Sequence, residues 1–158
     1  MHHTHQGHHA HSHHSESHHQ LPATVSFATL HCLVGCSLGE FAGLFIGVSF
    51  GLPVPAIFIL STTLAFITGL GLAVIPLMRR MNLGAAAALK VIWLGEAVSI
   101  AVMELAMNLT DYHMGGMTAQ SVWSWSFWGG FLLALHAGFI AAWPVNYWMI
   151  KAKLKKCH

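Results

Sequence analysis

The chain has 158 residues, of which 55 % are apolar and only 8 % are charged. Seven basic and five acidic residues give a formal net charge of +2. A soluble globular domain carries far more charge on its surface, so this composition excludes an ordinary water-soluble domain and indicates a membrane protein.

The first twenty residues form a separate segment that is rich in histidine. Its ten histidines are His2, His3, His5, His8, His9, His11, His13, His14, His18 and His19. Nothing in this segment can bury a core, so we expect residues 1–20 to be a disordered tail. Neutral imidazoles on a flexible chain bind zinc, copper or nickel in a pH-dependent manner, so the tail is predicted to collect metal ions. The alternative is a merely solubilising tail.

Four apolar runs follow, each long enough to cross roughly 30 Å of hydrocarbon. Each should be helical, because a helix satisfies its own backbone hydrogen bonds where water is absent. The predicted crossings are residues 24–51, 54–78, 86–108 and 126–150, in a membrane domain of residues 21–151 that precedes a basic tail, residues 152–158. Because proline tends to stop a helix from extending backwards, the first crossing is predicted to begin just after Pro22. The predicted fold is an all-α antiparallel bundle of four transmembrane helices.

The basic residues set the predicted orientation. With four crossings, the loop between the second and third lies on the same side as both termini, and every lysine and arginine falls on that side. The positive-inside rule makes this the cytoplasmic side of the cell's inner (plasma) membrane. Anionic lipid headgroups account for the basic residues, so we expect a lipid bilayer, and no nucleic acid, as a partner.

The first crossing carries most of the candidate metal ligands. Residues four apart lie one above the other on a helix, so Cys32, Cys36 and Glu40 form one column. An adjoining column begins at His31 and continues through small residues that allow another backbone to approach, namely Gly35, Gly39, Gly43 and Gly47. We interpret the two columns as a packed seam with potential metal ligands. The alternative is that the cysteines behave as small apolar residues in tight packing.

The third and fourth crossings add further polar groups, namely Glu96, Met103, Glu104 and His136. A carboxylate inside a membrane span costs about 2.5 to 3.5 kcal/mol on insertion scales and usually marks an ion path, a proton relay or a paired network. A structural alternative is that the carboxyls stay protonated or accept hydrogen bonds, for example from Asn108. We expect Glu40, Glu96 and Glu104 to be buried.

The loop expected between the third and fourth crossings, residues 110–118, contains a weaker candidate. His113 lies beside Met114 and close to Met117, and these residue types suit copper. Asp111 is the one formal charge predicted in the outer loops.

A faint internal repeat relates the first and third crossings. Leu38-Gly39-Glu40 recurs as Leu94-Gly95-Glu96. Two helical hairpins that enter the membrane from the same side would form a parallel repeat, with Glu40 and Glu96 at similar depth, and transporters commonly hold an ion at such an interface.

The sequence resembles a known family in three places. The run from His31 to Glu40, the segment from Ser99 through Met103-Glu104 to Asn108, and the exit Pro144-Val145-Asn146 are similar to the bacterial and archaeal membrane family called domain of unknown function 4396. The likeness covers about residues 28–151. It implies a small polytopic membrane protein in which these positions form the shared centre, and it implies no activity. The histidine-rich leader lies outside it.

Two functions of different class follow from these residues. The first is binding and transport of a transition metal of the copper, zinc or nickel class by His31, Cys32, Cys36, Glu40, Glu96, Met103, Glu104 and His136. The second is a non-transporting membrane module in which the glycine column forms a homo-oligomer or docks a partner. A haem-binding redox bundle ranks third. We expect no enzyme, because the sequence contains no nucleophile with a base, no phosphate loop and no cofactor fingerprint.

Overall fold

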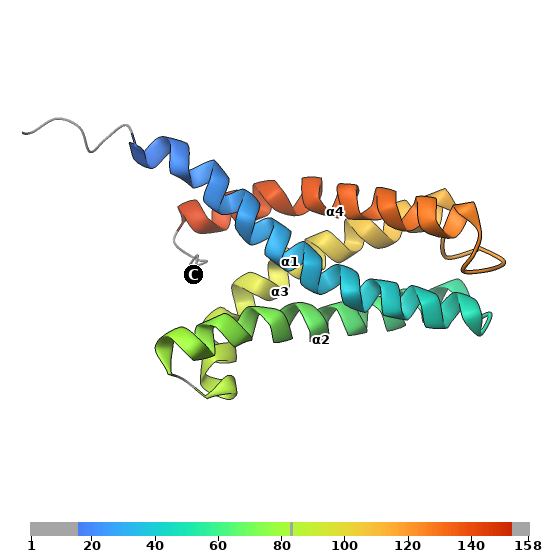
Figure 1. Cartoon of the computed structure of the whole chain (residues 1–158), viewed down its shortest axis with the longest axis horizontal. Helices are drawn as coiled ribbons and strands as arrows, with labels where there is room; N and C mark the ends of the chain where they lie inside the picture. Colours follow the sequence, from blue (N-terminus) through green and yellow to red (C-terminus); the bar gives the residue numbers. More distant parts are fainter. Residues whose placement is uncertain (1–15, 83, 153–158) are drawn as a thin grey trace, which may run out of the picture.

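The protein is a bundle of four long helices (Figure 1). The structure, a computed structural model, describes residues 16–82 and 84–152, with side chains from residue 21 onward except that of Arg80. The helices are α1 (Glu16–Ser49), α2 (Val54–Met81), α3 (Ala85–Met114) and α4 (Trp125–Lys151). Each is long and apolar enough to cross a membrane. The chain is therefore a multi-pass helical membrane protein, as its composition predicts.

The breaks between the helices follow from local sequence. Gly51 adopts a positive φ of 62° in the turn after α1, a conformation that glycine takes without steric cost. Gly115, with φ of 79°, ends α3 and donates its backbone N–H to the Tyr112 carbonyl. The hydroxyl of Ser124 accepts a hydrogen bond from the Phe127 backbone N–H (3.3 Å) and so caps the start of α4.

The helices are arranged as two hairpins that pack side by side. The most extensive contacts join α1 to α2 and α3 to α4, and smaller ones join α2 to α3 and α1 to α4. A few residues of α1 and α3 meet across the centre, whereas the described backbones of α2 and α4 lie further apart, on the other diagonal of the bundle. The start of α1, the α2–α3 connection and the end of α4 lie at one end of the bundle (Figure 1).

The four glycines of the predicted α1 column, Gly35, Gly39, Gly43 and Gly47, lie directly against α2. A Cβ atom on Gly35 would lie 3.0 Å from the Gly69 Cα atom. A Cβ on Gly39 would overlap the backbone of Leu64 and Ala65. The column is buried within one chain, so it leaves no glycine surface there on which a second copy could pack.

Two helix ends differ from those that the sequence predicts. α1 begins at Glu16 and contains Pro22, so proline does not stop the helix. Proline removes one backbone hydrogen bond, to the carbonyl four residues earlier, and close to the end of a long helix water can solvate that carbonyl. α3 runs to Met114, six residues beyond the predicted end at Asn108. Asp111 is therefore on a helix and not in a loop.

A single added methyl group tests the contact between α1 and α2. We expect Gly39→Ala to lower the free energy of unfolding by about 1 to 3 kcal/mol, because the new Cβ has no space beside the Ala65 backbone. The measurement is unfolding in mixed detergent–SDS micelles, followed by circular dichroism.

The matched control for this prediction is Gly129→Ala on α4, where an added Cβ meets nothing within 4 Å. Alanine is the better helix former, so the control should be neutral or slightly stabilising. Equal stability of the two variants would contradict the proposed close approach of the helices.

Candidate functional site

Two buried cysteines occupy the centre of the bundle. Cys36 is fully buried and Cys32 is 5 % exposed. Their thiols lie one helical turn apart on α1 and close enough to interact with each other. Met103 and Ile100 of α3 belong to the same buried cluster. The Cys36 sulfur lies close to Gly69 of α2, whereas the Met103 side chain lies against Gly138 of α4. The thiols therefore occupy a dehydrated space where α1, α2 and α3 meet.

A hydrogen-bonded chain of polar side chains links three helices beside the thiols. The Ser99 hydroxyl on α3 donates to the Asn146 side-chain oxygen on α4 (2.9 Å). The Asn146 amide in turn donates to the Thr29 hydroxyl on α1 (2.9 Å). The Cys32 sulfur lies 4.0 Å from the Ser99 hydroxyl oxygen, at the limit of a weak hydrogen bond. These buried groups are satisfied, and they hold α1, α3 and α4 in register.

Two buried carboxyl groups lie on the other side of the thiols along α1 and α3. Glu40 is fully buried, and neither of its side-chain oxygens has a hydrogen-bond partner among the described residues. Glu104 is 2 % exposed, and its Oε2 atom accepts from the Asn108 amide (3.2 Å), while Oε1 has no partner within the part of the chain that the structure describes. Asn108 is itself fixed by the Ser61 hydroxyl, which donates to its side-chain oxygen (3.0 Å). Both carboxyls are close enough to Cys36 to interact with it electrostatically.

Asp111 is a third buried acid, one that the sequence analysis placed in a loop. Its side chain is fully buried and sits against Gly116 and Gly130, where any added Cβ would overlap the carboxyl group. The spacing Glu104, Asn108, Asp111 is i, i+4, i+7, which is one face of a helix. That spacing could have revealed Asp111, but the Gly115-Gly116 pair and the nearby polar residues favoured a loop.

The remaining predicted ligands do not join this centre. His31 is exposed on α1, and His136 is exposed on α4, where its Nδ1 atom lies 2.8 Å from the Leu132 carbonyl oxygen. Glu96 is half-buried, so the expectation of three buried glutamates is wrong for this one. Two helices that cross at an angle pack closely only near the crossing point. Residues farther along a helix can face outward, even where their spacing in the sequence predicts that they face inward.

The described residues bring only part of the predicted ligand set together. Within residues 16–82 and 84–152, no group of three or more histidine, cysteine, aspartate or glutamate side chains is placed to hold a metal ion. The predicted ligands that lie near one another are the two thiols and the Glu40 and Glu104 carboxyls, and Met103 belongs to the same buried cluster as the thiols. The imidazoles of residues 1–20 lie outside the described side chains.

The weaker candidate around His113 does not form a cluster either. His113 and Met114 are exposed at the end of α3. Met117 is buried instead in an apolar cluster with Leu44 and Phe127. The three side chains therefore belong to different environments, because α3 continues through residues that were predicted to be a loop.

Comparison with known proteins places the chain in a family. Residues 23–155 match the family described as a domain of unknown function (DUF4396). The chain belongs to this family. The DUF4396 match covers nearly all of the four helices and therefore every buried polar residue described above. It extends beyond both ends of residues 28–151, the range over which the sequence motifs suggested the resemblance. The histidine-rich leader precedes it. No curated protein and no solved structure matches the chain.

A double-mutant cycle tests the polar chain beside the thiols. We expect Ser99→Ala and Asn146→Ala each to lower stability. Their coupling energy should be about 0.6 kcal/mol, the average for hydrogen bonds between membrane helices, and at most about 1.7 kcal/mol. Unfolding in mixed micelles measures all four variants. A coupling energy near zero would contradict the hydrogen bond between these residues.

Proposed function

We propose that this DUF4396 protein binds and moves a soft monovalent cation of the copper class at its buried thiol pair, a binding and transport function without catalysis. The observation that carries the proposal is the position of Cys32 and Cys36, two buried thiols one helical turn apart between the hairpins. Thiolate and thioether sulfurs are the ligands that select Cu(I). Met103, in the same buried cluster, offers a third sulfur.

The small number of converging ligands favours Cu(I) over zinc or nickel. Protein zinc sites take four nitrogen, sulfur or oxygen ligands in a tetrahedral arrangement. The described residues provide no group of three or more histidine, cysteine or acidic side chains for such a site. Cu(I) binds stably to as few as two sulfurs, which the thiol pair can supply.

The charge of the thiol pair also suits a monovalent ion. A buried ion is tolerated only when opposite charge is at hand, and one thiolate is enough to neutralise a monovalent cation, so the second cysteine can remain a neutral thiol. The Glu40 and Glu104 carboxyls lie further along the seam and would provide anionic or proton-accepting groups on a path from the thiols through the membrane.

The two other functions have less support. The glycine column, on which an oligomerising or docking module would depend, is buried against α2 within one chain. A haem held inside the bundle by two histidines would need imidazoles that point inward, and both His31 and His136 are exposed.

Competition with a Cu(I) chelator under anaerobic, reducing conditions tests the binding. We expect the purified full-length protein to hold a Cu(I) ion that Cys36→Ser weakens by more than about tenfold, or about 1.4 kcal/mol, because one of two main ligands is lost. Cys32→Ser should act similarly. Uptake of Ag(I), a non-redox analogue of Cu(I), into proteoliposomes tests transport, and Glu40→Gln should slow it.

The matched control is Cys157→Ser, which removes a cysteine far along the sequence from the pair. It should leave both Cu(I) affinity and Ag(I) uptake unchanged. Equal Cu(I) affinity in the wild type and in Cys36→Ser, with an unchanged circular dichroism spectrum, would overturn the proposal.

A further inference from the structure

Three buried carboxyl groups, those of Glu104, Glu40 and Asp111, form a row that leads from the thiol pair to one end of the bundle. Cys36 interacts electrostatically with Glu104 and Glu40. Glu40 interacts in the same way with Glu104 and Asp111. α1 and α3 run in the same direction, away from the α2–α3 connection (Figure 1). Glu40 lies nine residues before the end of α1 and Asp111 three residues before the end of α3, which is about 14 Å and about 5 Å of helix. We call these three residues the carboxyl row.

Most oxygens of the carboxyl row lack a hydrogen bond. Among the described residues, neither oxygen of Glu40 or of Asp111 has a partner, and Oε1 of Glu104 has none either. Glu40 and Asp111 are both fully buried. The Met117 backbone N–H lies near Asp111 but makes no hydrogen bond of good geometry with it. Because an unpaired buried acceptor is costly, these oxygens are placed for a ligand that the described side chains do not supply.

No basic side chain in the described part of the chain compensates for the carboxyl row. The lysine and arginine side chains that the structure describes are exposed and lie towards the opposite end of the bundle, namely Arg79, Lys90 and Lys151. The histidines of the described helices are exposed as well, namely His31, His113 and His136. Of the tyrosines, Tyr112 is exposed, and Tyr147 stacks on Trp143 near Lys151. The titratable groups that face the row from these helices are therefore the two thiols and the members of the row itself.

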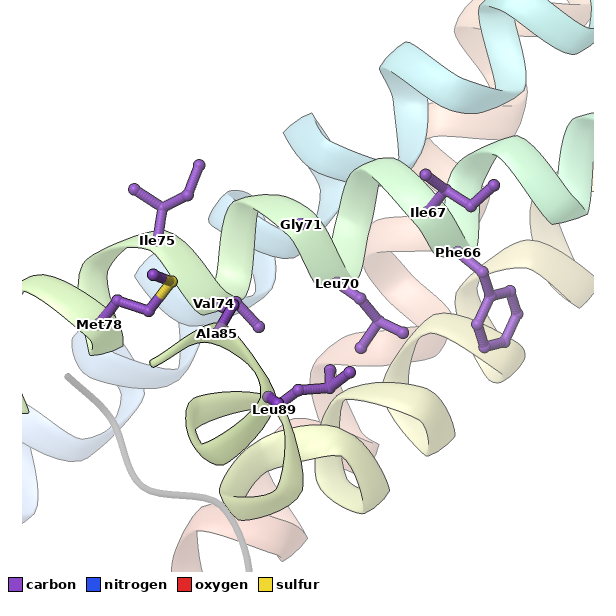
Figure 2. Close-up of a pocket in the computed structure, with 10 residues that line it drawn as sticks. Phe66, Ile67, Leu70, Gly71, Val74, Ile75, Met78, Ala85 and Leu89 are labelled. Atoms are coloured by element: carbon purple, nitrogen blue, oxygen red, sulfur yellow. The ribbon is translucent and has the colours of Figure 1, made fainter. Parts of the chain in front are cut away.

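A hollow on the outside of the bundle differs from the carboxyl row in that it offers no polar group. It lies between the second half of α2 and the first turns of α3, and it is lined only by apolar residues and glycine (Figure 2). Figure 2 shows Leu70 and Leu89 extending into this space. Such a surface cannot carry an ion, because it provides neither a hydrogen bond nor a counter-charge. Asp111 lies instead against Gly116 of the α3–α4 connection, so a proton that moves along the row leaves there.

The proton is the ligand that fits a row of this kind. A metal ion with oxygen ligands needs several oxygens that converge on one point. The described histidine, cysteine and acidic side chains form no group of three or more that could hold one. A proton needs a single oxygen, and it turns a buried carboxylate into a neutral acid, which removes an uncompensated charge. The Asn108 amide donates to Oε2 of Glu104 and so leaves Oε1 as the open position on that side chain.

We infer that Glu40 and Asp111 bind protons and, with Glu104, pass them between the thiol pair and the end of the bundle at the α3–α4 connection. The inference deepens the function proposed above and rests on it for the identity of the exchanged ion. When Cu(I) or Ag(I) binds, the S–H bond of one thiol breaks and a sulfur–metal bond forms. The released proton joins the row, and one proton leaves from Asp111. One cation has then replaced one proton, so the charge of the dehydrated interior is unchanged.

Infrared spectroscopy of the metal-free full-length protein in detergent tests proton binding by the row. At neutral pH an exposed carboxyl group is ionised, whereas a carboxyl group that holds a proton gives a separate C=O stretching band. We expect this band in the wild type, and Glu40→Gln and Asp111→Asn should each weaken it by a similar amount. A spectrum without the band at neutral pH, or a band that neither substitution weakens, would overturn the inference.

Accumulation of Ag(I) in proteoliposomes tests the exchange of a cation for a proton. With one-for-one exchange, a lumen more acidic than the outside by about one pH unit should raise the accumulation of Ag(I) about tenfold, because the two concentration ratios balance. Asp111→Asn should remove this dependence on the pH gradient. The matched control is Glu96→Gln, which changes a half-buried glutamate of α3 outside the row and should keep the dependence.

The proton row and the proposed transport of Cu(I) fail in different ways. Ag(I) accumulation that does not respond to the pH gradient, or that follows a Na⁺ gradient instead, would overturn the proton row and leave the transport in place. An equal loss of pH dependence in Glu96→Gln and Asp111→Asn would overturn it too, since the effect would not be specific to the row. An infrared band from the row without any uptake of Ag(I) would support proton binding and count against the transport.

Discussion

The direct contact between the backbones of α1 and α2 is the constraint on which the rest of the interior depends. At Gly39 and Gly43 there is no room for even a Cβ atom, because the backbones of Ala65 and Ser61 occupy the space. Such contact fixes how α1 is rotated about its axis. With the glycine column turned to α2, the adjoining column of Cys32, Cys36 and Glu40 must face the interior near α3.

The polar groups in this interior are of two kinds, those with hydrogen-bond partners and those without partners in the described part of the chain. Around Ser99 and Asn146, each hydrogen bond pairs a donor with an acceptor, and the chain of bonds connects three helices. Around Glu40 the oxygens have no partner in the described part of the chain. Unmade hydrogen bonds in a dehydrated space are expensive, so a protein that keeps them usually has a use for them. The thiol pair lies between these two environments.

The fold was largely readable from the sequence, because hydrocarbon requires long apolar helices and the four runs are unambiguous. The same holds for the buried state of Cys32, Cys36, Glu40 and Glu104, which follows from their place beside small residues or on a common helix face. The positions of His31, His136 and Glu96 were not readable in this way. Helices that cross at an angle are in contact only along a central stretch. Residues away from the crossing can face lipid even when a helical wheel places them on the inward face.

The polar loop predicted after Asn108 shows the opposite kind of error. Asp111 looked like an exposed charge because glycines and polar residues follow it, yet α3 continues and buries it. Composition alone could not separate a helix end from a loop here. The spacing of Asp111 from Glu104 and Asn108 was the better guide. Spacing along a helix determines which face of the helix a side chain lies on, and composition does not.

The two glycines around Asp111 carry a consequence for the whole family. Gly116 and Gly130 come from different segments, and both are positions where anything larger than hydrogen would collide with the carboxyl group. The acid and its two small neighbours thus occupy one shared volume. Among related chains, a bulkier residue at either glycine position is expected only together with a smaller one in place of the aspartate, so the three positions should change as a set over evolution.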